Sequence, residues 1–217
     1  MSSIFDILTL ICGYSILIPF FVCILLYKRI PEQFRHLVYF VFIATVGETV
    51  ARILFALQLE GLPALHAYTL IEGIILLLFY REVFRARFKS IYFTIAILLF
   101  SLSTILNSFI LQHVFEVNSN ARTLEALLII GCAVLLYFFL FELAETVYFK
   151  KPLLWINNGV FFYFTLSLLF FLFGNYLMHN YSKALNKMIW MMHAVFLIIF
   201  HLILARGIWL LGKKASS

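Results

Sequence analysis

Seven apolar runs, each long enough to cross a bilayer, follow one another along the chain with little sequence between them. The hydrocarbon core of a bilayer is about 30 Å thick, and roughly 20 residues of helix are needed to cross it. The runs cover residues 4–26, 36–58, 65–84, 91–112, 121–148, 154–177 and 188–211. Because backbone polar groups in lipid must be satisfied within the protein, runs of this length are expected to be helices. We therefore predict an all-α polytopic membrane bundle of seven transmembrane helices.

The composition agrees with a chain whose main partner is the lipid bilayer. Hydrophobic residues make up 65% and charged residues 12% of the 217 positions, whereas a soluble domain is about half apolar and about a quarter charged. Phe alone occupies 26 positions, and no polar half is present that would form a soluble domain. We predict a single transmembrane domain over residues 1–217.

The basic residues are distributed unequally between the two sides of the predicted bundle. Assigning the loops alternately to the two sides places twelve Lys and Arg on the side of the C-terminus and three, Arg122, Lys183 and Lys187, on the other. The twelve are Lys28, Arg29, Arg35, Arg81, Arg85, Arg87, Lys89, Lys150, Lys151, Arg206, Lys213 and Lys214. Since basic loops stay in the cytoplasm, the N-terminus is expected outside and the C-terminus inside. Basic edges facing anionic lipid account for the net charge of +6, so no nucleic acid partner is predicted.

Polar side chains within the spans lie at or near one depth, in the outer half of the predicted bundle. Ionisable residues inside a membrane are costly, so each is by default a candidate functional group. The candidate ligand-binding residues are Glu48, Arg52, Tyr68, Glu72, Asn107, Arg122, Glu125, Asn175 and His193. His201 lies two turns below His193, and we expect it to be a hydrogen-bonded core residue.

Helical spacing gives each acid in this layer a possible neighbour on its own helix. The pairs are Glu48 with Arg52, Tyr68 with Glu72, and Arg122 with Glu125. One interpretation is that such pairs only hold the bundle together. The other is that a surplus carboxylate, in particular Glu72 near Tyr68 and His193, binds a cation, an amine or a proton.

The polar residues also follow a rough repeat along the chain. Three successive helix pairs carry a polar residue near the outer end of the first helix and another early in the second: Arg52 and Glu72, Asn107 and Glu125, Asn175 and His193. The pattern permits an interpretation as one helix followed by three degenerate helical hairpins, although the side chains are too divergent to establish duplication.

Several seven-helix functions lack their motifs here. A retinal-binding protein needs a lysine in the middle of its last helix, and a zinc hydrolase of this architecture needs a His-x3-His pair there, whereas His193 and His201 are eight residues apart. No glycine-rich phosphate loop, GxSxG or HExxH sequence is present. We predict no cofactor and no metal, while Glu72, Glu125 and His193 are the residues from which an unfamiliar metal site would be built.

Four segments give the chain its resemblance to a known group of proteins. They are residues 66–72 (HAYTLIE), 121–125 (ARTLE), 155–159 (WINNG) and 190–193 (WMMH). With these segments the chain resembles a family of small bacterial seven-helix membrane proteins that has no assigned activity, some of whose members are encoded beside two-component signalling genes. The resemblance implies a location in the bacterial cytoplasmic membrane and adds a little weight to a sensory role.

Three functions are compatible with a polar cup in the outer half of a small helical bundle. A receptor-like sensor would bind a small ligand or cation there and signal through a separate protein partner, since the chain has no output domain. A membrane-embedded hydrolase would use the acids and His193 on a lipid, and a small transporter would use the repeat. For a sensor, the predicted docking surface is the polar inner rim formed by Arg81, Glu82, Arg85, Arg87, Lys89, Glu142, Glu145 and Arg206.

Overall fold

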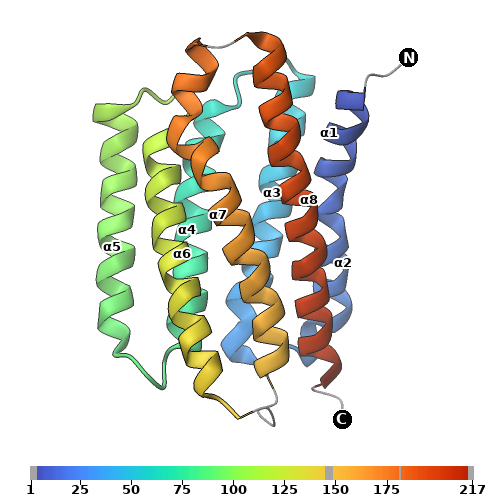
Figure 1. Cartoon of the computed structure of the whole chain (residues 1–217), viewed down its shortest axis with the longest axis vertical. Helices are drawn as coiled ribbons and strands as arrows, with labels where there is room; N and C mark the ends of the chain where they lie inside the picture. The colour runs from blue at the N-terminus through green and yellow to red at the C-terminus, as the bar shows by residue number, and fades with distance from the viewer. Residues whose placement is uncertain (1–3, 145–148, 181, 215–217) are drawn as a thin grey trace.

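The computed structural model describes residues 4–144, 149–180 and 182–214, without the side chains of residues 175, 178, 179, 183 and 214. Throughout these ranges the regular structure is helical, and no strand is present (Figure 1). Seven helices in them are long and apolar enough to cross a membrane. The prediction of an all-α chain with seven such helices is therefore confirmed.

The seven spans follow in chain order and alternate in direction, and α1 and α2 together make the first span. The helices are α1 (Ile4–Ser15), α2 (Leu17–Leu26), α3 (Arg35–Ala56), α4 (Leu62–Val83), α5 (Ser90–Leu106), α6 (Ser119–Glu142), α7 (Lys150–Asn180) and α8 (Lys183–Lys214), with short turns η1 (Tyr27–Arg29), η2 (Glu32–Phe34) and η3 (Asn107–Leu111). The two termini lie at opposite ends of the bundle (Figure 1). We call the end near the N-terminus, drawn at the top, the upper end, and the other the lower end.

The first apolar run forms two helices because a proline interrupts it. Pro19 has no N–H, so the carbonyl of Ser15, four residues earlier, loses its helical hydrogen bond. Helix α1 ends at Ser15 and α2 begins at Leu17. Together they still cover the length of one membrane span.

Six spans close into a ring, and the seventh lies outside it. Packing contacts join the α1–α2 span to α3, α3 to α4, α4 to α6, α6 to α7, α7 to α8, and α8 back to α1 and α2. Helix α5 packs mainly against α4 and lies at the left edge of Figure 1. The ring therefore has an interior, and side chains from six spans can meet there.

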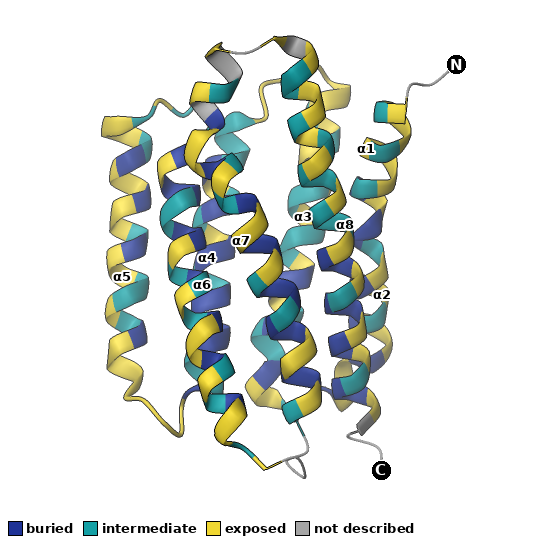
Figure 2. Cartoon of the chain, viewed as in Figure 1, coloured by how far each residue is buried: buried dark blue, intermediate teal, exposed yellow. Residues whose placement is uncertain are grey.

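The two halves of the ring interior differ in polarity. In the lower half it is filled by buried apolar side chains, among them Phe34 and Val41 of the second span and Leu140, Leu204 and Ile208 of the later ones. The buried charged groups all lie nearer the upper end. Many large apolar residues are exposed, and exposed residues recur along the helices in the view of Figure 2, which is the pattern expected of helices that face lipid.

The helix ends differ from the predicted spans mainly around the connection between α6 and α7. Helix α6 ends at Glu142 and not at residue 148, because Leu143 is extended and the Lys150 ammonium hydrogen-bonds its carbonyl at 2.7 Å. Residues 145–148, including Glu145 of the predicted rim, lie outside the described residues. Helix α7 begins at Lys150, before the predicted start at residue 154, and Pro152 occupies its first turn, where its missing N–H costs nothing.

Candidate functional site

Two acids and one arginine form a buried cluster between α4 and α6. Arg122 donates through Nη1 to Oε2 of Glu72 on α4 and, at 3.0 Å, to Oε2 of Glu125 on its own helix. The exposed fractions are 4% for Glu72, 9% for Arg122 and 1% for Glu125. We refer to these three residues as the buried charge cluster. The cluster carries one more acid than base, so the guanidinium alone does not balance two ionised carboxylates.

Tyr68 holds Glu72 from the same helix. Its hydroxyl donates to Oε1 of Glu72 at 2.9 Å, which confirms the predicted i,i+4 contact. The Tyr68 ring lies against α3 at Gly47, where an added Cβ would be 2.7 Å from the ring. Glycine at position 47 is therefore required for Tyr68 to reach its place beside Glu72.

Glu125 faces away from the centre of the ring. Its Oε2 is bonded to Arg122, but Oε1 has no hydrogen-bond partner in the described part of the chain. A Cβ added at Gly73 would lie 3.3 Å from that oxygen and 2.4 Å from the ring of Phe100. Glu125 thus lies toward the α4–α5 side of the bundle and holds Arg122 from the side that faces away from the ring interior.

A cavity of about 410 Å³ lies in the upper half of the ring, in front of the buried charge cluster. Ligand sites for small molecules commonly have volumes of about 300–1,000 Å³, with mostly apolar walls and a few polar groups. The polar residues in its wall are Glu48, Tyr68, Glu72, Arg122, Tyr163, His193 and His201. Five of the nine residues predicted to bind a ligand therefore line one cavity.

The cavity reaches the outer surface of the bundle between α3 and α4. Val46, Val50 and Ile71 belong to its wall and are also 43%, 38% and 41% exposed. Small residues of the two helices, Ala44 and Ala64 among them, leave the space between the backbones open.

Glu48 and Arg52 form the predicted i,i+4 ion pair, at 2.8 Å, but the two residues have different neighbours. Glu48 lines the cavity. The Arg52 guanidinium lies over the Tyr14 ring at 4.6 Å and against Gly13, where an added Cβ would be 1.4 Å from Nη2. Arg52 therefore attaches α3 to α1, and for this residue the packing interpretation fits best.

The two histidines of α8 lie at different depths in the cavity. His193 is surrounded by aromatic rings and lies 3.4 Å from the Tyr163 hydroxyl through Nε2, a long contact. Within the described residues it makes no hydrogen bond to Glu72 or Glu125. His201 is buried and pairs its Nδ1 with the Ser15 hydroxyl at 2.7 Å, beside the break between α1 and α2.

Asn107, which was also predicted to bind the ligand, lies in a polar cluster separate from this cavity. Asn107 belongs to an amide cluster at the upper end, where it donates to Gln112 at 3.1 Å and to Asn118 at 3.3 Å and accepts from Asn120 at 3.0 Å. Asn107 is not among the residues of the cavity wall, because depth along a helix does not fix the direction of a side chain. The Asn175 side chain lies outside the described part.

Tyr163 and His201 line the cavity, and Ser15 contacts His201, although the sequence did not assign these residues to the ligand site. Tyr163 occurs in a helix rich in Phe and Tyr, so nothing in the local sequence distinguishes it. The possible metal site does not form either: no three His, Cys, Asp or Glu side chains in the described ranges lie together as metal ligands would, Glu72, Glu125 and His193 included.

Comparison of the chain with protein-family models, curated proteins and solved structures gives no match. The geometry of the cavity and of the surfaces around it is thus the basis for a functional proposal.

Proposed function

We propose that this protein is a receptor-like sensor of the bacterial cytoplasmic membrane, which binds a small ligand in the upper cavity and signals to a separate protein at its lower end. The observation that carries the proposal is the cavity itself, in which Glu48, Tyr68, Glu72, Arg122 and His193 converge from four helices. Buried ionisable groups around a cavity of ligand size are expected at binding sites, since packing alone would favour apolar residues.

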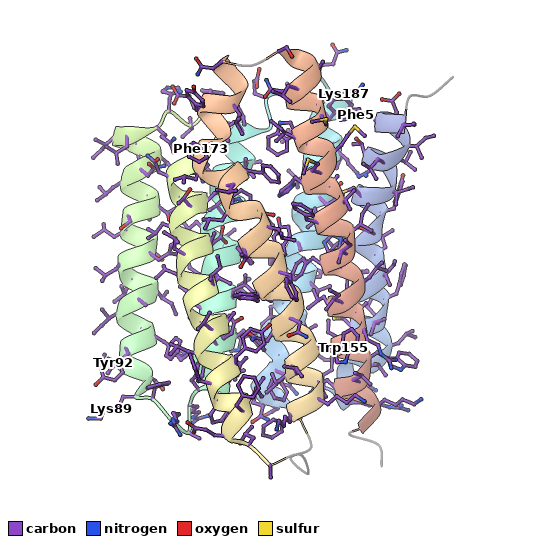
Figure 3. All side chains as sticks on the ribbon, in the orientation of Figure 1. Phe5, Lys89, Tyr92, Trp155, Phe173 and Lys187 are labelled. Atoms are coloured by element: carbon purple, nitrogen blue, oxygen red, sulfur yellow. The ribbon has the colours of Figure 1, made fainter. Side chains whose placement is uncertain are left out.

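The proposed orientation has the upper end outside the cell and the lower end in the cytoplasm. Its support is the excess of Lys and Arg near the lower end. Aromatic and basic side chains suited to the membrane surface, Lys89, Tyr92 and Trp155, lie toward that end (Figure 3). At the upper end, Lys187 lies 4.2 Å from the ring centroid of Phe5 and joins α8 to α1 (Figure 3).

The closed lower half of the ring favours a receptor. The cavity ends at Phe40, Phe200 and His201. Below these residues the interior is filled by side chains with exposed fractions near zero, such as Val41 and Leu204. Among the described residues the cavity wall does not continue below these side chains, so ligand binding would act on the lower end through the packing of the helices.

A polar surface at the lower end is available to a partner. Arg87 in the α4–α5 connection pairs with Glu142 at the end of α6 at 2.6 Å, and Glu82 pairs with Arg81 and Arg85. A hollow of about 300 Å³ adjoins Glu82 and Arg85. This part of the predicted rim is charged and accessible, as a docking surface must be.

A transporter is the second candidate, and one observation favours it. Helix α1 ends and α2 begins beside the cavity floor, where Ile16 keeps helical backbone angles and Ser15 contacts His201. Interrupted helices at mid-membrane are common at the substrate sites of transporters. Uptake into vesicles of a compound that stabilises the protein would favour this candidate over the sensor.

The test of the sensor is to reverse charges on the lower rim. Arg85→Glu combined with Arg87→Glu is expected to abolish crosslinking of the partner in native membranes, because both arginines lie in the proposed docking surface. Lys28→Glu with Arg29→Glu makes the same change of charge at the end of α2 and is the matched control. Protease accessibility must first show unchanged orientation, since basic residues also set topology. Retention of every wild-type partner, or the absence of any partner in the wild type, would contradict the sensor.

A further inference from the structure

We infer that the cavity binds an amphiphile from the bilayer, with one hydrocarbon chain and one cationic amine, which enters between α3 and α4. The inference rests on the proposed function in that it names the ligand class of the same cavity. It is carried by three independent features: where the cavity opens, what lines it, and which charge is in surplus there.

The opening lies on the lipid-facing side of the bundle. Val46 and Val50 of α3 and Ile71 of α4 belong both to the cavity wall and to the exposed apolar surface. Leu57 and Phe55, near the upper end of the same surface, are also exposed. A molecule dissolved in the bilayer thus reaches the cavity without crossing water.

The wall suits a hydrocarbon chain over most of its area. Apart from its seven polar residues it is lined by aliphatic, aromatic and glycine residues, with Ile43 and Leu197 in the middle and Phe40 and Phe200 at the floor. Burying a CH₂ group in such surroundings instead of in water is favourable by about 0.8 kcal/mol, but a chain already in lipid gains little by the transfer. Selectivity must therefore come from the polar end.

The charges near the cavity leave a negative surplus. Three carboxylates, Glu48, Glu72 and Glu125, are matched by two guanidinium groups, those of Arg52 and Arg122. With the histidines neutral the sum is one negative charge, in a region of low dielectric where unbalanced charge is costly. One cationic group restores neutrality.

Acceptors for an amine face the cavity. Of the two carboxylate oxygens of Glu48, Oε1 accepts a hydrogen bond from Arg52, while Oε2 has no partner among the described residues and is open to a donor. Glu72 has both oxygens bonded, but each carboxylate oxygen can accept more than one hydrogen bond. The aromatic rings of Tyr68 and Tyr163 in the same wall add favourable surfaces for a cation.

An anionic head group fits less well. Arg122 is the cationic residue of the cavity wall, and its Nη1 already donates to two carboxylates. A fatty acid would therefore add a third negative charge beside the buried charge cluster. An uncharged alcohol would leave the surplus unbalanced.

The experiment uses the full chain in phosphatidylcholine nanodiscs and follows its thermal unfolding midpoint. The probes are decylamine, decanol, decanoate and butylamine, so that head group and chain vary separately. Decylamine is expected to raise the midpoint saturably by about 4 °C, while the other three leave it within about 1 °C. Glu72→Gln should abolish the rise. If that variant does not fold, Glu48→Gln, which leaves the buried charge cluster intact, is used instead. It should raise the decylamine concentration needed for the half-maximal rise at least fivefold. Glu142→Gln at the lower rim is the control and should retain the full rise.

The outcomes separate the inference from the proposed function. If decanol or decanoate stabilises the protein as much as decylamine, the requirement for an amine is overturned. If butylamine stabilises it as much as decylamine, the requirement for a hydrocarbon chain and for access from the bilayer is overturned. If the stabilisation by one of these other compounds is lost in Ala44→Phe, which fills the cavity, the cavity still binds a ligand and the proposed function stands. If decylamine stabilises Ala44→Phe and Glu48→Gln as much as the wild type, the cavity is not its site and both are overturned.

Discussion

Arg122 of α6 and Glu72 of α4 meet at the inner wall of the upper cavity, where one guanidinium nitrogen also holds Glu125. The contact joins helices that are separated by α5 in the sequence and that neighbour each other in the ring. It places a charge cluster with an unequal number of acids and bases beside a cavity of ligand size.

The first prediction is that Arg122→Ala destabilises the protein far more than Arg52→Ala. Removing Arg122 leaves two buried carboxylates without a counter-charge, a change that typically costs about 3–5 kcal/mol. Arg52 is about one third exposed and pairs with one carboxylate, so its loss should cost about 1 kcal/mol. Chemical unfolding in the same detergent measures the unfolding free energy of both variants. Equal losses of stability would show that the buried charge cluster contributes no more than the exposed ion pair.

The second prediction concerns the close approach of α3 to Tyr68. Gly47→Ala places a methyl group against the Tyr68 ring and should cost about 1–3 kcal/mol. Gly131→Ala on α6 is the control, because an added Cβ there meets no atom within 4 Å. That control should be neutral or stabilising, since alanine favours helix. A neutral Gly47→Ala would mean that Tyr68 does not lie over position 47.

The seven spans could be predicted because they depend on local sequence. A long apolar run must be helical in lipid wherever it lies. The i,i+4 contact of Tyr68 with Glu72 and the pair Glu48–Arg52 follow from helical spacing alone and are present. The interruption at Ile16 could also have been anticipated, from Pro19, since proline removes one helical hydrogen bond.

The composition of the cavity could be predicted only in part. Counting residues from a helix end gives the depth of a side chain, but its direction depends on how the helix is rotated in the bundle. For that reason the sequence predicts the depth of Asn107 but not the amide cluster in which it lies. Tyr163 of the cavity wall was missed, because one more aromatic residue in an aromatic helix gives no signal.

The third prediction follows from the separation of these clusters. Asn107→Ala should lower stability by about 1–2 kcal/mol, because its amide partners at the upper end lose hydrogen bonds. It should leave decylamine stabilisation unchanged, since Asn107 is not part of the cavity wall. Melting curves with and without decylamine separate the two effects. If Asn107→Ala instead abolished the stabilisation by decylamine without lowering stability, Asn107 would be part of the ligand site.

The fourth prediction concerns the contact between the broken first span and α8. A double-mutant cycle of Ser15→Ala and His201→Phe should give a coupling energy of about 1 kcal/mol, as expected for a buried hydrogen bond. The cycle compares the unfolding free energies of the wild type, both single variants and the double variant. Additive effects, within about 0.3 kcal/mol, would show that the two side chains do not interact.

The most direct measurement of the central claim, that the upper cavity is a ligand site, is native mass spectrometry of protein purified in a mild detergent from its own membranes. We predict a bound small molecule on the wild type and its loss from Ala44→Phe, which fills the cavity from α3. Ala56→Phe makes the same change on the exposed end of the same helix and should keep the bound molecule. An equal amount of bound molecule on Ala44→Phe and the wild type, or none on any of the three proteins, would contradict the claim.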